Sequence, residues 1–284
     1  MAFPGERFRL STASEHTAGQ RAVGQHAVGL GARGHLRIIW ALLLRELATR
    51  YGRDNLGFLW VIGEPLVFAG GVLVLWNFAR PPYEHGIPVL AFVITGYMPI
   101  ILVRHMIAHG MYAVRVNQGL LYHRQVTVLH LFVARALLEF VGVTLAFVVI
   151  GAGLMLFGAM APPQNLPLVY GGWFILAAIS LGLALIFGGL SEIFPFVERF
   201  VAVITYILVP LSGTFYMAAW LPPPLRQAAL YLPFLHCVEM IRGGFFGEFT
   251  PTYYDAAYAA AWAAGFIVVG LALVRGVRSR VEIE

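Results

Sequence analysis

The sequence predicts an all-α integral membrane protein with six transmembrane helices, an N-terminal amphipathic interface helix and a re-entrant hairpin before the last span. Of its 284 residues, 60% are hydrophobic and only 12% are charged, and the mean hydropathy is +0.78. A soluble domain carries roughly 25% charged residues. Several apolar runs reach the roughly 20 residues that a helix needs to cross the hydrocarbon core, and they lack the alternating pattern of outer-membrane barrel strands.

The N-terminal region divides into a tail and an interfacial helix. Residues 1–34 have no apolar block of signal-peptide length and too few apolar side chains to offset the entropy of ordering, so we expect a flexible cytoplasmic tail. Residues 35–55 predict an amphipathic helix in the membrane interface, with Trp40 and leucines toward the acyl chains and arginines toward the headgroups. The interfacial residues assigned to this helix are Arg45, Glu46, Arg50 and Tyr51.

The apolar runs that follow give the predicted spans. Glu64 and Pro65 stand near the start of the first one; a carboxylate in a span usually faces protein or water, and proline is tolerated in a first helical turn. The third run is longer than a bilayer requires, which predicts a protruding end or a tilt. The fourth is rich in glycine, which permits close helix contact. The predicted spans are residues 62–78, 87–103, 128–157, 168–190, 200–216 and 256–274.

Residues 218–255, between the last two spans, are too polar to cross the membrane and too apolar for a free loop. They predict two short amphipathic helices separated at Pro233. Half-length helices are tolerated in a membrane only against protein or a water-filled cavity, so we expect a re-entrant hairpin over the mouth of a pathway. The arginines near the spans gather on one side, and the positive-inside rule then predicts cytoplasmic termini and a hairpin on the outer face.

The basic residues also limit the chemistry. All 19 are arginine, because the chain contains no lysine. A P-loop needs its lysine to reach the nucleotide phosphates, so any nucleotide energy must come through another chain. The single cysteine, Cys237, offers neither an internal disulfide nor a metal-binding spacing. We therefore predict a protein that is not itself an enzyme and that binds no cofactor or metal.

The segment between the second and third spans is polar and basic and contains no acid. We expect it to form a short cytoplasmic helix that continues directly into the third span, and so to carry motion from a soluble partner into the membrane. An ordinary loop is the simpler alternative. The residues assigned to this coupling role are Asn117, Gln118, Gly119, Leu120, Tyr122, His123 and Arg124.

Other polar residues near the spans have less specific interpretations. Arg135 and Glu139 lie four residues apart, on one helix face, and predict a structural ion pair. His105, His109 and His123 are too irregularly spaced to predict a metal site. Aromatic faces on the first span and a basic entrance would suit an acidic glycan, and the candidate substrate pathway consists of Trp60, Glu64, Phe68, Arg104, His105 and Arg115.

Several blocks together resemble the permease subunit of capsular-polysaccharide ABC exporters. The similarity extends over nearly everything from His35 on. A late block, Pro233-Phe234-Leu235-His236 with Glu239 and Arg242, is similar to one found in the broader family of type-2 ABC export permeases. The blocks of the capsule permeases are Leu44-Arg45-Glu46-Leu47 with Arg50-Tyr51, Leu56-Gly57-Phe58-Leu59-Trp60, Glu64-Pro65, Asn117-Gln118-Gly119-Leu120 and Ala134-Arg135-Ala136-Leu137-Leu138-Glu139.

The resemblance implies a type-2 ABC transmembrane domain over residues 56–284, in a bacterial inner membrane. Such a subunit pairs with a second copy of itself and with two separate ATP-binding subunits, which hold ATP and Mg, and it moves a lipid-linked acidic polysaccharide. It implies a periplasmic adaptor and outer-membrane export proteins as further partners, contact with membrane lipids, and no nucleic acid. The residues that it assigns to an outer gate are Pro233, His236, Glu239 and Arg242.

Three other functions compete with this interpretation. Related permeases export O-antigen or teichoic acid. A polytopic glycosyl- or acyltransferase would need catalytic carboxylates or histidines converging on one face, yet the only aspartates, Asp54 and Asp255, stand at span edges. An ion-coupled carrier would need ionisable groups near the midplane or inverted repeats. Stimulation of an ATPase by a partner chain would separate the exporters from the last two classes.

Overall fold

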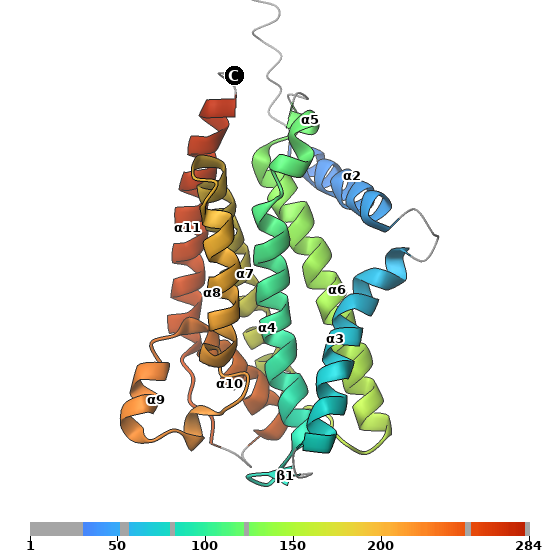
Figure 1. Cartoon of the computed structure of the whole chain (residues 1–284), viewed down its shortest axis with the longest axis vertical. Coiled ribbons are helices and arrows are strands. Elements are labelled where there is room, and N and C mark those ends of the chain that lie inside the picture. Colours follow the sequence, from blue (N-terminus) through green and yellow to red (C-terminus); the bar gives the residue numbers. More distant parts are fainter. Residues whose placement is uncertain (1–30, 52–56, 80–82, 122–124, 248–250, 282–284) are drawn as a thin grey trace, which may run out of the picture. The chain divides into compact units, whose positions relative to one another are not determined.

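The computed structural model describes residues 31–51, 57–79, 83–121, 125–247 and 251–281. The chain divides into two compact units, residues 1–37 and residues 38–284. Helix α2 (Ala32–Tyr51) begins in the first unit and continues in the second. The long helices of the second unit run side by side in Figure 1, and they are α3 (Gly57–Ala79), α4 (Val89–Met111), α6 (Val128–Leu156), α7 (Leu166–Ile193), α8 (Val197–Leu211) and α11 (Ala256–Val281).

The predicted all-α membrane class is confirmed. Among the described residues, four helical segments are long and apolar enough to cross a membrane, and α3 adds a shorter apolar stretch, Gly63–Ala79. The helix α8 is 15 residues long. Six crossings therefore stay a prediction. The four long segments are Val89–Met111, Val128–Leu156, Leu166–Ile193 and Ala256–Gly276.

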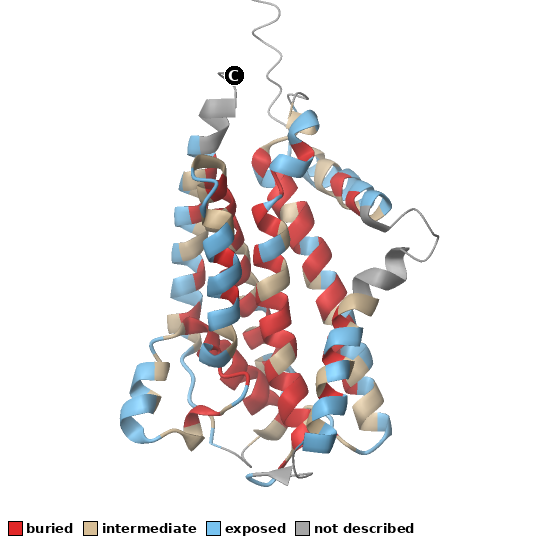
Figure 2. Cartoon of the chain, in the orientation of Figure 1, coloured by how far each residue is buried: buried red, intermediate tan, exposed pale blue. Residues whose placement is uncertain are grey.

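Helix α4 forms the centre of the packing. Buried residues make up 78% of its most apolar stretch, against 22% for α11, and α4 contacts α3, α6, α7 and α8. Figure 2 shows the buried residues concentrated along α4 and its neighbours. The glycines of α7 allow the close contacts expected from the sequence, because a Cβ added at Gly182 would meet Phe266 of α11, and one added at Gly188 would meet Phe132 of α6.

Two helices have ends that differ from the approximate bounds predicted for their spans. Helix α4 continues to Met111, eight residues past the predicted end at 103, because Met106, Ile107 and Met111 remain buried in the core. Helix α8 stops at Leu211 instead of 216. The chain turns just after it, at Gly213, whose φ of +83° is a conformation that favours glycine.

The short elements lie between the long helices. Strands β1 (Tyr83–Glu84) and β2 (Ile87–Pro88) pair antiparallel between α3 and α4. The two turn residues between them, His85 and Gly86, have positive φ, as type I′ turns require. The remaining short helices are η1 (Arg115–Asn117), α5 (Gln118–Leu121), η2 (Ala218–Trp220), α9 (Pro223–Ala229) and α10 (Pro233–Phe246).

Candidate functional site

Asn117, the first residue of the predicted coupling segment, is buried and ties that segment to α2. Its side-chain carbonyl accepts a hydrogen bond of 2.7 Å from Nη1 of Arg45. Its amide nitrogen donates to Oε1 of Glu46 at 2.9 Å and to the backbone carbonyl of Ala113 at 3.1 Å. Both ends of the amide are thus satisfied. The segment after α4 is fixed to α2 by side chains as well as by apolar packing.

Arg135 of α6 joins the same group of residues. Its Nε and Nη2 donate to the two carboxylate oxygens of Glu46 at 3.1 and 3.4 Å, and its Nη1 donates to the backbone carbonyl of His109 at 2.9 Å. A two-pronged arginine–carboxylate contact fixes orientation as well as distance. We call Arg45, Glu46, Asn117 and Arg135 the polar junction. It connects α2, α4, η1 and α6.

The polar junction corrects the predicted ion pair within the third span. Arg135 pairs with Glu46 of α2, and Glu139 faces His105 and His109 of α4. The i, i+4 spacing placed the two residues on one face correctly, but both charges bind partners on other helices. Glu46 also differs from the expectation of an interfacial residue, since its side chain is only 7% exposed.

An apolar layer surrounds the polar junction. Leu42 of α2 belongs to one buried apolar cluster with Ala113 and Val114 before η1 and with Val128 and Leu131 at the start of α6. Removal of water from these surfaces strengthens the charge-assisted contacts, and it also makes an unpaired charge there costly. In contrast, Leu36, Trp40 and Leu44 of α2 are exposed, whereas Leu43 and Leu47 are half-buried, and contact of this helix with lipid stays a prediction.

The rest of the coupling segment divides into an exposed and an undescribed part. Gln118 and Gly119 of α5 are exposed, whereas Leu120 is half-buried against the apolar layer. A Cβ added at Gly119 would meet no atom within 4 Å. The coupling residues outside the described part of the chain are Tyr122, His123 and Arg124, and the side chains of Arg50, Tyr51 and Trp60 are likewise not described.

The expected continuity between the coupling helix and the third span is wrong. Helix α5 ends at Leu121, and α6 begins at Val128 with its own N-cap. The Thr127 hydroxyl accepts from the His130 backbone N–H, and the His130 Nδ1 accepts from the Thr127 N–H. This capping box satisfies donors at the start of α6 without any preceding helix. The described connection from the segment to α6 therefore runs through the side chains of the polar junction.

The residues of the candidate substrate pathway have contacts on different helices. The guanidinium of Arg104 lies 4.4 Å from the centre of the Tyr206 ring of α8. Arg115 pairs with Glu198 of α8 at 2.5 Å. His105 faces α6 instead, while Glu64 is half-buried and Phe68 is exposed on α3. A single pathway through these residues remains a prediction.

The side chains assigned to the outer gate are buried and engaged with backbone groups. Glu239 accepts from the backbone N–H groups of Ala218 and Tyr253 at 3.1 and 3.0 Å. Burial raises the pKa of the Glu239 carboxyl, while these donors and Arg242 act to lower it. Because both carboxylate oxygens accept these bonds, Glu239 fixes the segments that contain Ala218 and Tyr253 to α10.

Arg242, also fully buried on α10, binds the turn that follows α8. It donates to the backbone carbonyls of Gly213 and Tyr216 at 2.6 Å and to that of Thr214 at 2.9 Å, and it lies over the Phe92 ring of α4. Arginine presents a rigid fork of donors that suits several carbonyls at once. Arg242 therefore joins α4, α10 and the end of α8.

His236 and Pro233 complete the set on α10. The His236 Nδ1 accepts from the backbone N–H of Asp255 at 2.8 Å, so its Nε2 carries the proton and donates to the Leu230 carbonyl at 2.7 Å. Pro233 is buried at the start of α10, a position that proline suits. Two short helices, α9 and α10, form as predicted, but α10 begins at Pro233 itself and is buried on all sides instead of amphipathic, and their entry into the membrane remains a prediction.

The sequence alone did not indicate the contacts of Glu139 or Glu198. A signal for the Glu139 contact was present in the four-residue spacing of His105 and His109, which places both rings on one face of a helix. It was obscured because the second span was expected to end at 103. Glu198 gave no such signal, because its partner Arg115 lies far away in sequence.

Comparison with known proteins gives a consistent set of relatives. No protein-family model matches the chain. The chain is 35% identical over 246 residues to the capsule polysaccharide export inner-membrane protein CtrC of Neisseria meningitidis serogroup B, a match that covers 87% of this chain and 93% of that protein. It is 33% identical, with the same coverage, to the capsule polysaccharide export inner-membrane protein BexB of Haemophilus influenzae. The polysialic acid transport protein KpsM of Escherichia coli is 28% identical over 239 residues, or 83% of this chain and 91% of the relative.

Proposed function

The chain belongs to the family of capsule polysaccharide export inner-membrane proteins, and on this premise we propose that it is the transmembrane subunit of an ATP-driven exporter of lipid-linked capsular polysaccharide. The observation that carries this proposal is similarity over almost the whole length of proteins named for that export. Long apolar helices support a membrane location. The absence of lysine from the sequence supports an energy source on another chain.

We further propose that two separate ATP-binding subunits, holding ATP and Mg, dock on a pair of these chains. Exposed Gln118 and Gly119 on α5 offer a surface for that docking. Motion of this surface would reach the membrane helices through Asn117, which contacts α2, and then through the contact between Glu46 and Arg135. Such a route needs no continuous helix. It requires only that the polar junction move as one body.

The proposed orientation places both termini and the polar junction on the cytoplasmic side and α9 on the outer side. Figure 1 shows α5 and the start of α6 at one end of the second unit and α9 at the opposite end. The arginine distribution supports this assignment. In this arrangement α3 and α8 would complete six crossings.

Deletion of the gene in the source bacterium tests the exporter assignment. The deletion strain is expected to synthesise capsular polysaccharide and retain it inside the cell, and the parental gene supplied in trans should restore it to the surface. Surface and intracellular polysaccharide are measured separately by immunoblotting of intact and lysed cells. Unchanged surface polysaccharide in the deletion strain would overturn the assignment. Surface O-antigen or teichoic acid, measured in the same cells, identifies the alternative cargo classes.

A further inference from the structure

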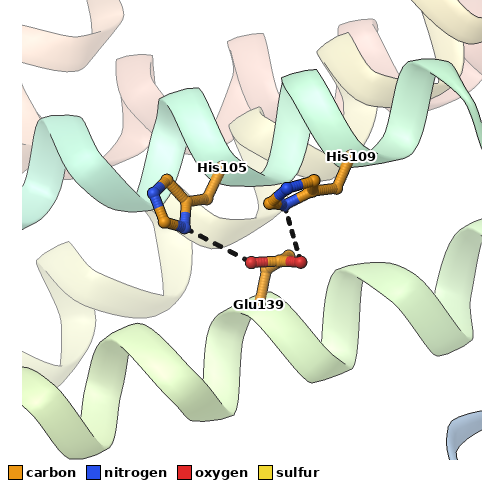
Figure 3. Close-up of side chains that lie close together, drawn as sticks. All are labelled: His105, His109 and Glu139. Carbon is orange, nitrogen blue, oxygen red and sulfur yellow. Dashed lines mark ion pairs between the residues drawn. The ribbon is translucent and has the colours of Figure 1, made fainter. Parts of the chain in front are cut away.

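A group of potential ligands lies where α4 contacts α6, beyond the polar junction. His105 and His109 project from successive turns of α4 toward Glu139 of α6 (Figure 3). The Nδ1 of His105 is 3.4 Å from Oε2, and the Nδ1 of His109 is 2.7 Å from Oε1. One ligand atom from each residue lies within 4.8 Å of the others. The proposed route through the polar junction uses none of these three side chains, although His105 also belongs to the candidate substrate pathway.

The His109 contact is unusual because of its geometry. Its Nδ1 is buried and makes no aligned hydrogen bond among the described residues, although it stands 2.7 Å from a carboxylate oxygen. With the ring proton on Nε2, the nitrogen lone pair would face an anionic oxygen at that distance and repel it. A positive charge between the two atoms removes the repulsion. Either a proton or a metal cation can supply it.

We propose that His105, His109 and Glu139 bind a divalent transition-metal cation of the zinc class. Two imidazole nitrogens and one carboxylate oxygen form a donor set that zinc accepts, with bonds of about 2.0–2.2 Å. In a tetrahedral site such bonds place the donor atoms about 3.3 Å apart. The separations of 3.4 and 2.7 Å involve different oxygens of the Glu139 carboxylate, so binding through one oxygen requires a small rotation of that carboxylate.

Exposure and charge around the group suit an exchangeable ion. The side chain of His109 is 31% exposed and that of His105 is 18%, whereas that of Glu139 is 7%. An ion can therefore enter from the histidine side, where a water completes the fourth position. Arg135, which lies one turn before Glu139 on α6, binds the His109 carbonyl and pairs with Glu46.

A bound ion would connect α4 to α6 by direct bonds, one helical turn along α6 from Arg135 and its contact with Glu46. Because the ligands come from two helices, binding requires that these helices keep the relation seen here. The ion would then stabilise this conformation over any in which α4 and α6 separate. This inference does not depend on what the protein exports.

The test uses the purified full-length chain in detergent, with any polyhistidine tag removed and metals stripped by a chelator. Zinc is titrated against a chromophoric competitor, and Co²⁺ is added separately as a spectroscopic probe. We expect one equivalent of zinc to bind and the Co²⁺ adduct to show the strong visible absorption of a four-coordinate site. Glu139→Gln and His109→Asn should each weaken zinc binding at least tenfold.

His85→Asn is the matched control, because it removes a histidine outside the group and asparagine tolerates the positive φ found there. It should bind zinc like the parent. A parent that binds no more zinc than His105→Asn/His109→Asn overturns the proposal and leaves a proton between His109 and Glu139. An octahedral Co²⁺ spectrum would also overturn it. The melting temperature of each variant without metal identifies any variant that misfolds. The zinc titration of the parent tests the proposed site even if a variant misfolds.

Discussion

Glu46 illustrates how a single residue sets the structure of the polar junction. Its carboxylate accepts hydrogen bonds from Asn117 and from Arg135, which lie more than 70 and 80 positions away in the sequence. A buried carboxylate without those donors would carry an uncompensated charge. Removing one partner of Glu46 is therefore expected to destabilise the fold by more than the intact ion pair stabilises it.

Replacing Glu46 by leucine should destabilise the protein by about 3–5 kcal/mol, since it leaves Arg135 buried without its counter-charge. Glu46→Leu/Arg135→Leu should recover much of that loss, because it removes both charges. Equilibrium unfolding in detergent provides the comparison. If the double variant is less stable than Glu46→Leu alone, Arg135 does not depend on Glu46 and the pairing is wrong.

Gly96 on α4 gives a second prediction at this scale. An added Cβ would lie 2.5 Å from Nη2 of Arg242 and 2.5 Å from the carbonyl oxygen of Thr214. Gly96→Ala should therefore cost about 1–3 kcal/mol by overpacking. Gly71→Ala on α3 is the control; it has open space and should be neutral or slightly stabilising. Equal unfolding midpoints for the two variants would argue against the close approach of Arg242 to α4.

The sequence identified the polar residues of the junction but did not predict which residues they contact. Arg45, Glu46, Asn117 and Arg135 all stood out as polar residues in an apolar chain, yet each was assigned alone or with a near neighbour. Local periodicity indicates only which residues of one helix share a face. Which helix that face meets depends on packing, and here the partners of Glu46 are distant in sequence.

At the scale of elements, apolar pattern located the long helices and misjudged some of their ends. The predicted spans 128–157 and 168–190 correspond closely to α6 and α7. The end of α4 was placed too early because Arg104, His105 and His109 interrupt the apolar run. These polar residues remain helical since each contacts a side chain of a neighbouring helix. Tertiary contact outweighed local polarity.

The exposed helix α5 carries the prediction about partner docking. Gly119→Trp places a bulky ring on an exposed surface with no atom nearby, so the fold should be unaffected while docking of the ATP-binding subunit is blocked. We expect at least a tenfold loss of that subunit in co-purification, with parental melting behaviour. Gly119→Ala is the control with a small side chain and should retain the subunit. Full retention by the tryptophan variant would exclude this surface from the docking interface.

For the whole molecule, composition alone was sufficient for the class but not for the topology. An apolar chain with few charges must cross lipid as helices, and the described helices agree with this. The number of crossings is harder to infer, since α3 and α8 are short in their apolar parts. Orientation depends on arginine placement, which is a statistical property of loops and leaves no signature in helix packing.

Single-cysteine labelling tests the proposed topology. In a Cys237→Ala background, a cysteine replaces either Gln118 or Gln227, both of which are exposed. A membrane-impermeant maleimide added to intact spheroplasts should label the Gln227 variant and spare the Gln118 variant until the membrane is opened. Labelling of the Gln118 variant in intact spheroplasts would place the polar junction outside and reverse the proposed orientation.

The capping box at Thr127 makes the start of α6 independent of the segment that precedes it. Helix α6 has its own start signal, so substitutions, insertions or deletions between α5 and Thr127 leave the rotational phase of the membrane helix unchanged. Sequence changes in this linker are therefore compatible with an unchanged start of α6. A chimaera that receives this linker from a relative should keep its own transmembrane architecture, as measured by membrane insertion and melting.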